Sequence, residues 1–159
     1  AMMGLHSPKL SDKIETHSAW LVKEGNPQEV ANMAWVCAMM GLHLQKLFEE
    51  IEKHSAWLVK EGTPQEVANT AWSCATMGLH LPKVFAEIEK QSAWLVKEGT
   101  PQAAANAALA FSTLGYHSEV FFGSFCKIIP QLTKQGNGQE IINVCYAFAI
   151  LDLTGNYEK

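Results

Sequence analysis

Apolar and polar positions along this chain recur with the period of an α-helix, not with the alternation of a strand. The larger apolar stripe consists of Leu47, Ile51, Ser55 and Leu58, with Phe48 and Val59 beside it. Small residues mark a second stripe at Ala68, Ala71 and Ala75, where neighbouring helices can approach closely. Both stripes predict amphipathic helices that bury one face, and therefore an all-α fold.

Capping residues divide this pattern into pairs of helices. Thr63 stands at an N-cap position, followed by a proline at the first helical position and by Glu66 at the third, which together form a capping box. Gly78 can end this helix in the left-handed conformation, so we predict a helix over residues 64–77. The other helix of the pair is predicted over residues 82–98, between a proline and a glycine. Loops of two or three residues make successive helices antiparallel neighbours.

The helix pair recurs every 37 residues. The sequence Ser-Ala-Trp-Leu-Val-Lys-Glu-Gly occurs three times, and proline, glycine, histidine and asparagine positions follow the same period. One hairpin of this length cannot bury its apolar face but stacked copies can, which predicts an α-solenoid of four helix-turn-helix repeats. We expect repeats at 8–44, 45–81, 82–118 and 119–155, with residues 1–7 ending a truncated preceding repeat and residues 156–159 forming a tail.

Composition places the chain among ordered proteins. Of its 159 residues, 48% are hydrophobic and 18% are charged, and the longest apolar run, residues 144–151, is far too short to cross a membrane. The net charge is −4, and all 12 basic residues are lysine. The lack of arginine counts against a dedicated phosphate or nucleic-acid reader, because arginine supplies the bidentate fork. The four cysteines do not form a disulfide pattern, so we expect free, buried thiols.

Motifs for catalysis and cofactor binding do not stand out. The sequence shows no glycine-rich phosphate loop, nucleophile elbow or paired-carboxylate site, so we expect a protein that is not an enzyme and needs no cofactor. His6, His43, His80 and His117 recur one full repeat apart, whereas a metal ion needs several ligands around one point. We therefore expect no metal site, no small-molecule substrate and no membrane insertion.

A family resemblance rests on residues 64–78. The Pro-Gln start, the Ala68 and Asn69 pair, Trp72 and the closing glycine resemble the octotricopeptide and heptatricopeptide repeats, which are commonly 37 or 38 residues long. Proteins with these repeats occur in the organelles of algae and protists. The resemblance covers almost the whole chain, and it implies RNA binding in mitochondria or plastids, in transcript processing, translation or organellar ribosomes.

Lysines spaced by seven predict a charged helix face opposite the apolar stripe. In stacked repeats these lysines would form ladders that contact RNA phosphates without reading sequence. The alternative is a solvated face with helix ion pairs such as Glu49 with Lys53. The candidate RNA-backbone residues are Lys23, Lys53, Lys60, Lys90, Lys97 and Lys134.

Two sets of residues in register are interpreted as structural. Asparagine is a poor residue inside a helix, so four copies at one register predict a ladder that hydrogen-bonds the backbone of neighbouring loops; contact with RNA bases is the alternative. Glycines at another register end the second helices. These structural residues are Asn32, Asn69, Asn106 and Asn143, with Gly41, Gly78 and Gly115.

Large apolar residues recur at one register of the second helices, namely Trp35, Trp72, Leu109 and Tyr146, and we expect them in the core. The last repeat is unusually apolar, and Pro130 is expected to interrupt its first helix. Its Phe121, Phe122 and Phe125 fill a looser core or form a docking surface for another protein.

Two functions follow from these observations. The leading hypothesis is a non-catalytic scaffold that binds single-stranded RNA or rRNA in an organelle, either in gene expression or in a ribosome. The alternative is a protein-binding architectural subunit of a large organellar complex, which the net negative charge and the missing arginine favour. The sequence does not indicate which helix of each pair lines the concave face.

Overall fold

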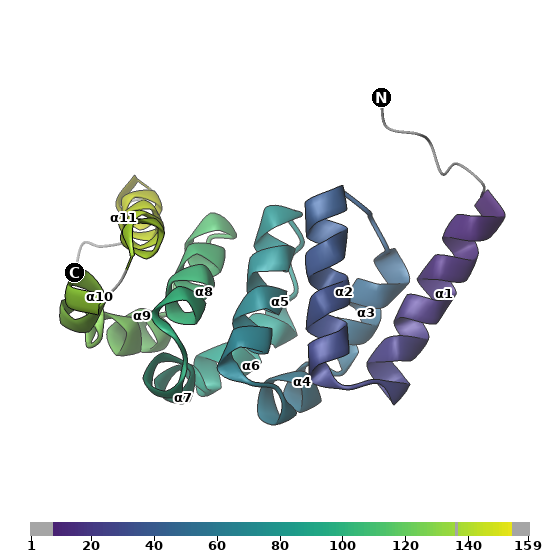
Figure 1. The fold of residues 1–159 in the computed structure, drawn as a ribbon, viewed down its shortest axis with the longest axis horizontal. Coiled ribbons are helices and arrows are strands. Elements are labelled where there is room, and N and C mark those ends of the chain that lie inside the picture. Colours follow the sequence, from purple (N-terminus) through teal and green to yellow (C-terminus); the bar gives the residue numbers. More distant parts are fainter. Residues whose placement is uncertain (1–7, 136, 154–159) are drawn as a thin grey trace.

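The computed structural model of the chain describes residues 8–135 and 137–153, and within these residues it holds only helices. Figure 1 shows them in a single row that runs from α1 at the N-terminal end to α10 and α11 at the other. The helices are α1 (Pro8–Glu24), α2 (Pro27–Met40), α3 (Gln45–Lys53), α4 (Ser55–Glu61), α5 (Pro64–Thr76), α6 (Pro82–Lys90), α7 (Ser92–Glu98), α8 (Pro101–Thr113), α9 (Glu119–Cys126), α10 (Ile129–Gln135) and α11 (Gly138–Leu153). The predicted all-α, solenoid-like fold is confirmed.

The helices form two layers along the row. In Figure 1, α2, α5, α8 and α11 stand side by side along one side of the array, and the shorter helices lie along the other. Each long helix of the first layer packs against the next one, α2 on α5, α5 on α8 and α8 on α11. No helix in the described part of the chain has the length and apolar character needed to cross a membrane.

Capping at both ends defines the helices of the first layer as predicted. At the start of α5, the Thr63 side chain accepts a hydrogen bond from the Glu66 backbone nitrogen, and the Glu66 carboxylate accepts one from the Thr63 nitrogen. Gly41, Gly78 and Gly115 have φ values of 64°, 65° and 72°, the left-handed conformation that only glycine adopts without strain. The helix predicted over 64–77 ends one residue earlier in the structure.

The helices of the second layer after α1, which is continuous, are interrupted, whereas the sequence predicted one continuous helix over 82–98. A single residue with backbone angles in the sparsely populated bridge region separates the two halves of each interrupted helix. His54 lies between α3 and α4 at φ −101° and ψ 19°, and Gln91 lies between α6 and α7 at φ −103° and ψ 14°. A further break separates α9 from α10. Pro130 follows that break, inside α10, and alanine stands at the equivalent positions 56 and 93, so a proline does not cause the interruption.

The apolar stripes form the core between the two layers. Every residue of the larger predicted stripe is buried, including Ser55, and so are the three alanines of the second stripe. Because alanine adds little bulk, α5 can lie close to α2 and α8. Burying a leucine or isoleucine side chain contributes roughly 1.5–3 kcal/mol, so these stripes supply much of the folding free energy.

Glutamates join successive pairs in a way that the sequence did not indicate. The carboxylate of Glu52 accepts hydrogen bonds from the backbone nitrogens of Lys83, at 2.9 Å, and of Val84, at 3.2 Å. Glu15 accepts one from Lys46 in the same register, also at 2.9 Å. Each carboxylate thus caps the first turn of a helix in the next pair, where unpaired backbone N–H groups and the helix dipole favour negative charge.

Candidate partner-binding groove and lysine surface

A groove of about 470 Å³ crosses the layer of long helices. Its walls carry amide and aromatic side chains from four helices, α2, α5, α8 and α11. The lining residues are Trp35, Met39, Gln65, Asn69, Trp72, Gln102, Asn106, Asn137, Gln139, Glu140 and Asn143. The same registers therefore contribute in successive helices, which makes the groove a product of the repeat.

The asparagines of the groove hydrogen-bond to other amides. Gln65 Nε2 donates to Asn69 Oδ1 and Gln139 Nε2 donates to Asn143 Oδ1, each at 2.9 Å, because residues four apart share one helix face. Asn143 Nδ2 also donates to Asn106 Oδ1 at 3.3 Å, which links α11 to α8. We expected these asparagines to hydrogen-bond the backbone of neighbouring loops. They bond to other side-chain amides instead, because they lie within the helices and face the groove.

Aromatic residues that the sequence placed in the core at one register of the long helices are more exposed than predicted. Trp35 is 45% exposed and Tyr146 is 58% exposed, and Trp72 is half-buried. Their core assignment is wrong for a geometric reason: Ala34 and Ala71 take the buried positions, and the next residue points about 100° further round the helix. Tryptophan side chains therefore stand at the groove instead of inside the array.

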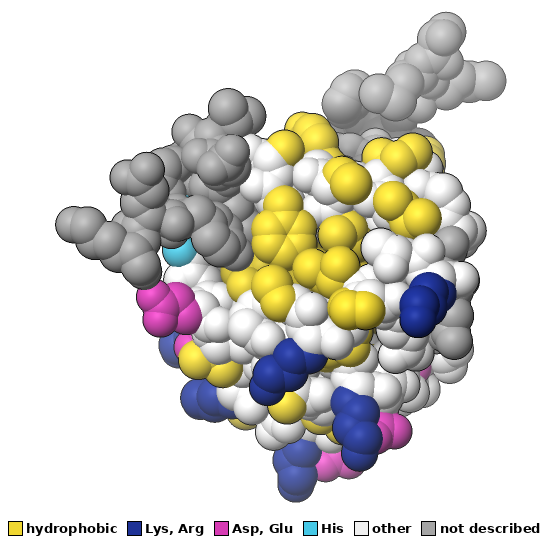
Figure 2. Space-filling model, turned by 90° about the vertical axis from the view of Figure 1, so that its left-hand side faces the viewer, with side chains coloured by type: hydrophobic (Ala, Val, Ile, Leu, Met, Phe, Trp, Pro, Cys, Tyr) yellow, Lys and Arg dark blue, Asp and Glu magenta, His cyan; other side chains and the backbone are white. Residues whose placement is uncertain are grey.

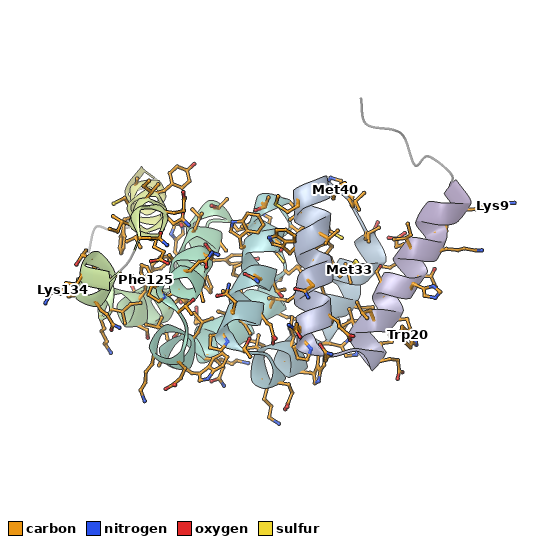
Figure 3. All side chains as sticks on the ribbon, in the orientation of Figure 1. Lys9, Trp20, Met33, Met40, Phe125 and Lys134 are labelled. Carbon is orange, nitrogen blue, oxygen red and sulfur yellow. The ribbon has the colours of Figure 1, made fainter. Side chains whose placement is uncertain are left out.

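Candidate lysines lie outside this groove, and most of them are paired with carboxylates. Lys53 is 2.7 Å from Glu50 and Lys90 is 2.6 Å from Glu87, both within one helical turn. The remaining pairs are Lys60 with Glu61 and Lys97 with Glu98, each at 3.4 Å, and Lys23 with Glu50 at 3.7 Å. Figure 3 shows Lys134 pointing away from the array at its C-terminal end.

The lysine residues differ in two details from what the sequence led us to expect. Lys53 pairs with Glu50, whereas Glu49 accepts a hydrogen bond from Gln45 Nε2 at 2.7 Å. The break at His54 separates Lys53 from Lys60, so their seven-residue spacing no longer places them on one continuous helix.

The pKa shifts around Glu50 show that the lysine charges interact with neighbouring carboxylates. The hydrogen bond from Lys53, together with the nearby charge of Lys23, lowers the pKa of the Glu50 carboxyl, and the same hydrogen bond raises the pKa of the Lys53 ammonium. Exposed ion pairs contribute only about 0–1 kcal/mol, so they do not lock the lysines in place. The adjacent carboxylates nevertheless cancel much of the positive potential that a phosphate backbone would meet.

The three phenylalanines proposed as a docking surface lie in the core. Phe121 and Phe125 are fully buried and Phe122 is nearly so, because the rings stack on one another and on Phe111, with the ring centres of Phe111 and Phe121 4.2 Å apart. Figure 3 places Phe125 inside the C-terminal end of the array. They fill the core of the last pair, which corrects the docking assignment.

Other apolar side chains remain exposed in this part of the chain. Val120 of α9 and Ile142 of α11 are both exposed. Figure 2 looks onto the C-terminal end, where apolar side chains gather in the middle of the view and lysines lie along its lower part. The surface here is apolar, but it is made by residues other than the three phenylalanines.

All four cysteines are free thiols. Cys37 and Cys74 are buried, and burial raises the pKa of the first to about 11 and of the second to about 12, so both are protonated at neutral pH. Cys126 and Cys145 are exposed, which differs from the prediction that the thiols are buried. Among the residues that the structure describes, no three His, Cys, Asp or Glu side chains form a group that could hold a metal ion.

A family model for the RNA-editing substrate-binding complex 6 protein matches residues 1–156 of this chain. No individual curated protein matches it.

Proposed function

Because the chain belongs to the family of the RNA-editing substrate-binding complex 6 protein, we propose that it is a non-catalytic scaffold subunit of such a complex. The observation that carries this proposal is the groove across α2, α5, α8 and α11, which the repeat builds from the same residue types in successive helices. An array of stacked helices offers an extended surface of this kind for holding partners together.

Protein binding is favoured over RNA binding at this surface. Glu140 is the one charged residue that lines the groove in the described part of the chain, and lysine is missing from its walls. RNA-binding surfaces are rich in positive charge because phosphates dominate the affinity. We propose the organellar location from the resemblance of the 37-residue unit to octotricopeptide and heptatricopeptide repeats.

RNA contact by the lysines is the second candidate function. Lys60 and Lys97 are 80% and 82% exposed, and they stand at the same position of successive pairs. Each lysine can give up its ion pair with the adjacent glutamate, which contributes little to stability, and contact an RNA phosphate instead. This contact would add to affinity without reading the RNA sequence, and it needs no residue of the groove.

Native co-purification tests both proposals in one experiment. The tagged full-length protein is purified at about 150 mM salt, with and without RNase, and its partners are identified by mass spectrometry. We expect subunits of an RNA-editing substrate-binding complex that stay bound after RNase treatment, because protein contacts hold the scaffold. Loss of all subunits on RNase treatment favours the lysine contact instead, and co-purification of none of these subunits contradicts membership of the complex.

A further inference from the structure

Resting on the proposed scaffold function, we infer that the groove across α2, α5, α8 and α11 binds an extended, neutral or basic segment of a partner polypeptide. The inference names the occupant of the groove by its chemistry. It depends on the amides that line the walls, on the charge of the groove and on the aromatic side chains beside it.

Primary amides match the groups of a peptide backbone. Each asparagine or glutamine offers a carbonyl acceptor and two N–H donors, which can pair with the N–H and C=O of one peptide unit. Several of these amides are already held in place: Gln65 donates to Asn69 and accepts from the Thr100 hydroxyl at 3.1 Å. An amide that is fixed before binding loses little conformational entropy when it pairs with a ligand.

The spacing of the amides also suits an extended chain. Neighbouring helices lie about 8–10 Å apart, so the three intervals from α2 to α11 span roughly 24–30 Å. An extended peptide rises about 3.3 Å per residue, so roughly eight residues cover this length. About three residues then pass each helix, and Asn69, Asn106 and Asn143 can each contact one of the peptide units.

Charge distinguishes a polypeptide from RNA as the occupant. The groove carries one carboxylate, Glu140, and the chain as a whole has a net charge of −4. A nucleic acid brings one negative charge per nucleotide, which a binding surface must neutralise with lysine or arginine. A neutral or basic polypeptide meets no such repulsion in the groove, and a lysine or arginine on it can pair with Glu140.

Aromatic side chains supply the apolar contact that amides alone lack. Trp35 and Met39 are exposed on α2, and Trp72 borders the same groove on α5. Tryptophan is enriched among the residues that dominate binding at protein interfaces. Apolar side chains of the bound segment would pack between these residues while its backbone pairs with the amides.

Site-specific photo-cross-linking in the native complex tests this inference. Trp35 is replaced with photoreactive p-benzoylphenylalanine in the full-length protein, and the purified complex is irradiated and digested. We expect a cross-link to one segment of another subunit, resistant to RNase and mapped by mass spectrometry. The matched control carries the same replacement at Trp20, which is also exposed but lies on α1 outside the groove, and it should not cross-link to that segment.

The outcomes separate this inference from the scaffold proposal. If the protein enters the complex but position 35 cross-links to RNA, or to no subunit, the groove does not bind a polypeptide and the inference is overturned. If the protein co-purifies with no subunit of the complex, the scaffold proposal itself fails, and the groove assignment fails with it.

Discussion

Individual carboxylates in this protein act between helix pairs as well as on the surface. Glu52 looks in sequence like one of several glutamates on a solvated face, yet its two oxygens cap the first turn of α6. The partners are 31 and 32 residues away along the chain. This contact ties one pair of helices to the next in a way that apolar packing alone does not specify.

Glu52→Ala should therefore lower the free energy of unfolding by about 1–2 kcal/mol, since it removes two charge-assisted hydrogen bonds from a helix N-terminus. Chemical denaturation monitored by circular dichroism measures the change. Glu49→Ala is the matched control, because Glu49 is exposed on the same helix and bonds to Gln45 of its own turn, so its effect should stay within about 0.5 kcal/mol. Equal effects of the two substitutions would contradict the capping role.

Prediction from sequence succeeded for residues whose role is decided within one helix. The stripe from Leu47 to Leu58 and the capping residues Thr63 and Gly78 behave as predicted, because periodicity and local capping depend on near neighbours. The role of Trp35 was misjudged, and that of Phe121 was left open between the core and a docking surface, because both roles depend on neighbours that are distant in the sequence. The apolar character of a single residue beside the stripe does not show whether its side chain is buried, because the stacking of the helix pairs decides that.

A close contact at the end of α7 joins the second layer to the preceding helix pair. Gly99 ends α7 in an extended conformation, so its backbone would suit any residue. A Cβ there would clash with the carbonyl oxygen of Leu95 and would lie 3.1 Å from the Cβ of Pro64, which begins α5. The glycine thus allows α7 to end directly against the preceding pair.

Gly99→Ala should lower the free energy of unfolding by about 1–3 kcal/mol, because the added methyl group forces the two pairs apart. Gly123→Ala provides the control, since a Cβ at this position inside α9 would meet no atom within 4 Å apart from its chain neighbours and the backbone of its own helix. Alanine favours a helix interior, so this second change should raise stability by about 0.5–1 kcal/mol. Thermal unfolding measures both, and a stabilising Gly99→Ala would contradict the close packing.

The last pair shows how an element can keep its structure after its sequence has changed. Gly138 replaces the proline found at the start of the other long helices, yet α11 still begins with a reciprocal cap between Asn137 and Glu140. The proline is lost from this helix, but the side-chain pair that satisfies the first turn persists. Asn143 of the same helix also remains hydrogen-bonded to Asn106.

The whole molecule has two contrasting surfaces. Amides and aromatic side chains line the groove across the long helices, and lysines alternate with glutamates outside it. The sequence predicted the solenoid, because a 37-residue unit repeated in register leaves few other ways to bury its apolar face. The groove could not be predicted in the same way, since it forms only when side chains from four helices come together.

The most direct test of the central claim compares the two surfaces in the native complex. The groove variant Trp35→Ala/Met39→Ala and the lysine variant Lys60→Glu/Lys97→Glu both change exposed residues, so both should fold. Retention of each full-length variant in the RNase-treated complex is measured against the unmodified protein. We predict that the groove variant loses binding by about tenfold or more, as expected for an interface tryptophan, while the lysine variant remains bound. Loss of the lysine variant with full retention of the groove variant would contradict the account.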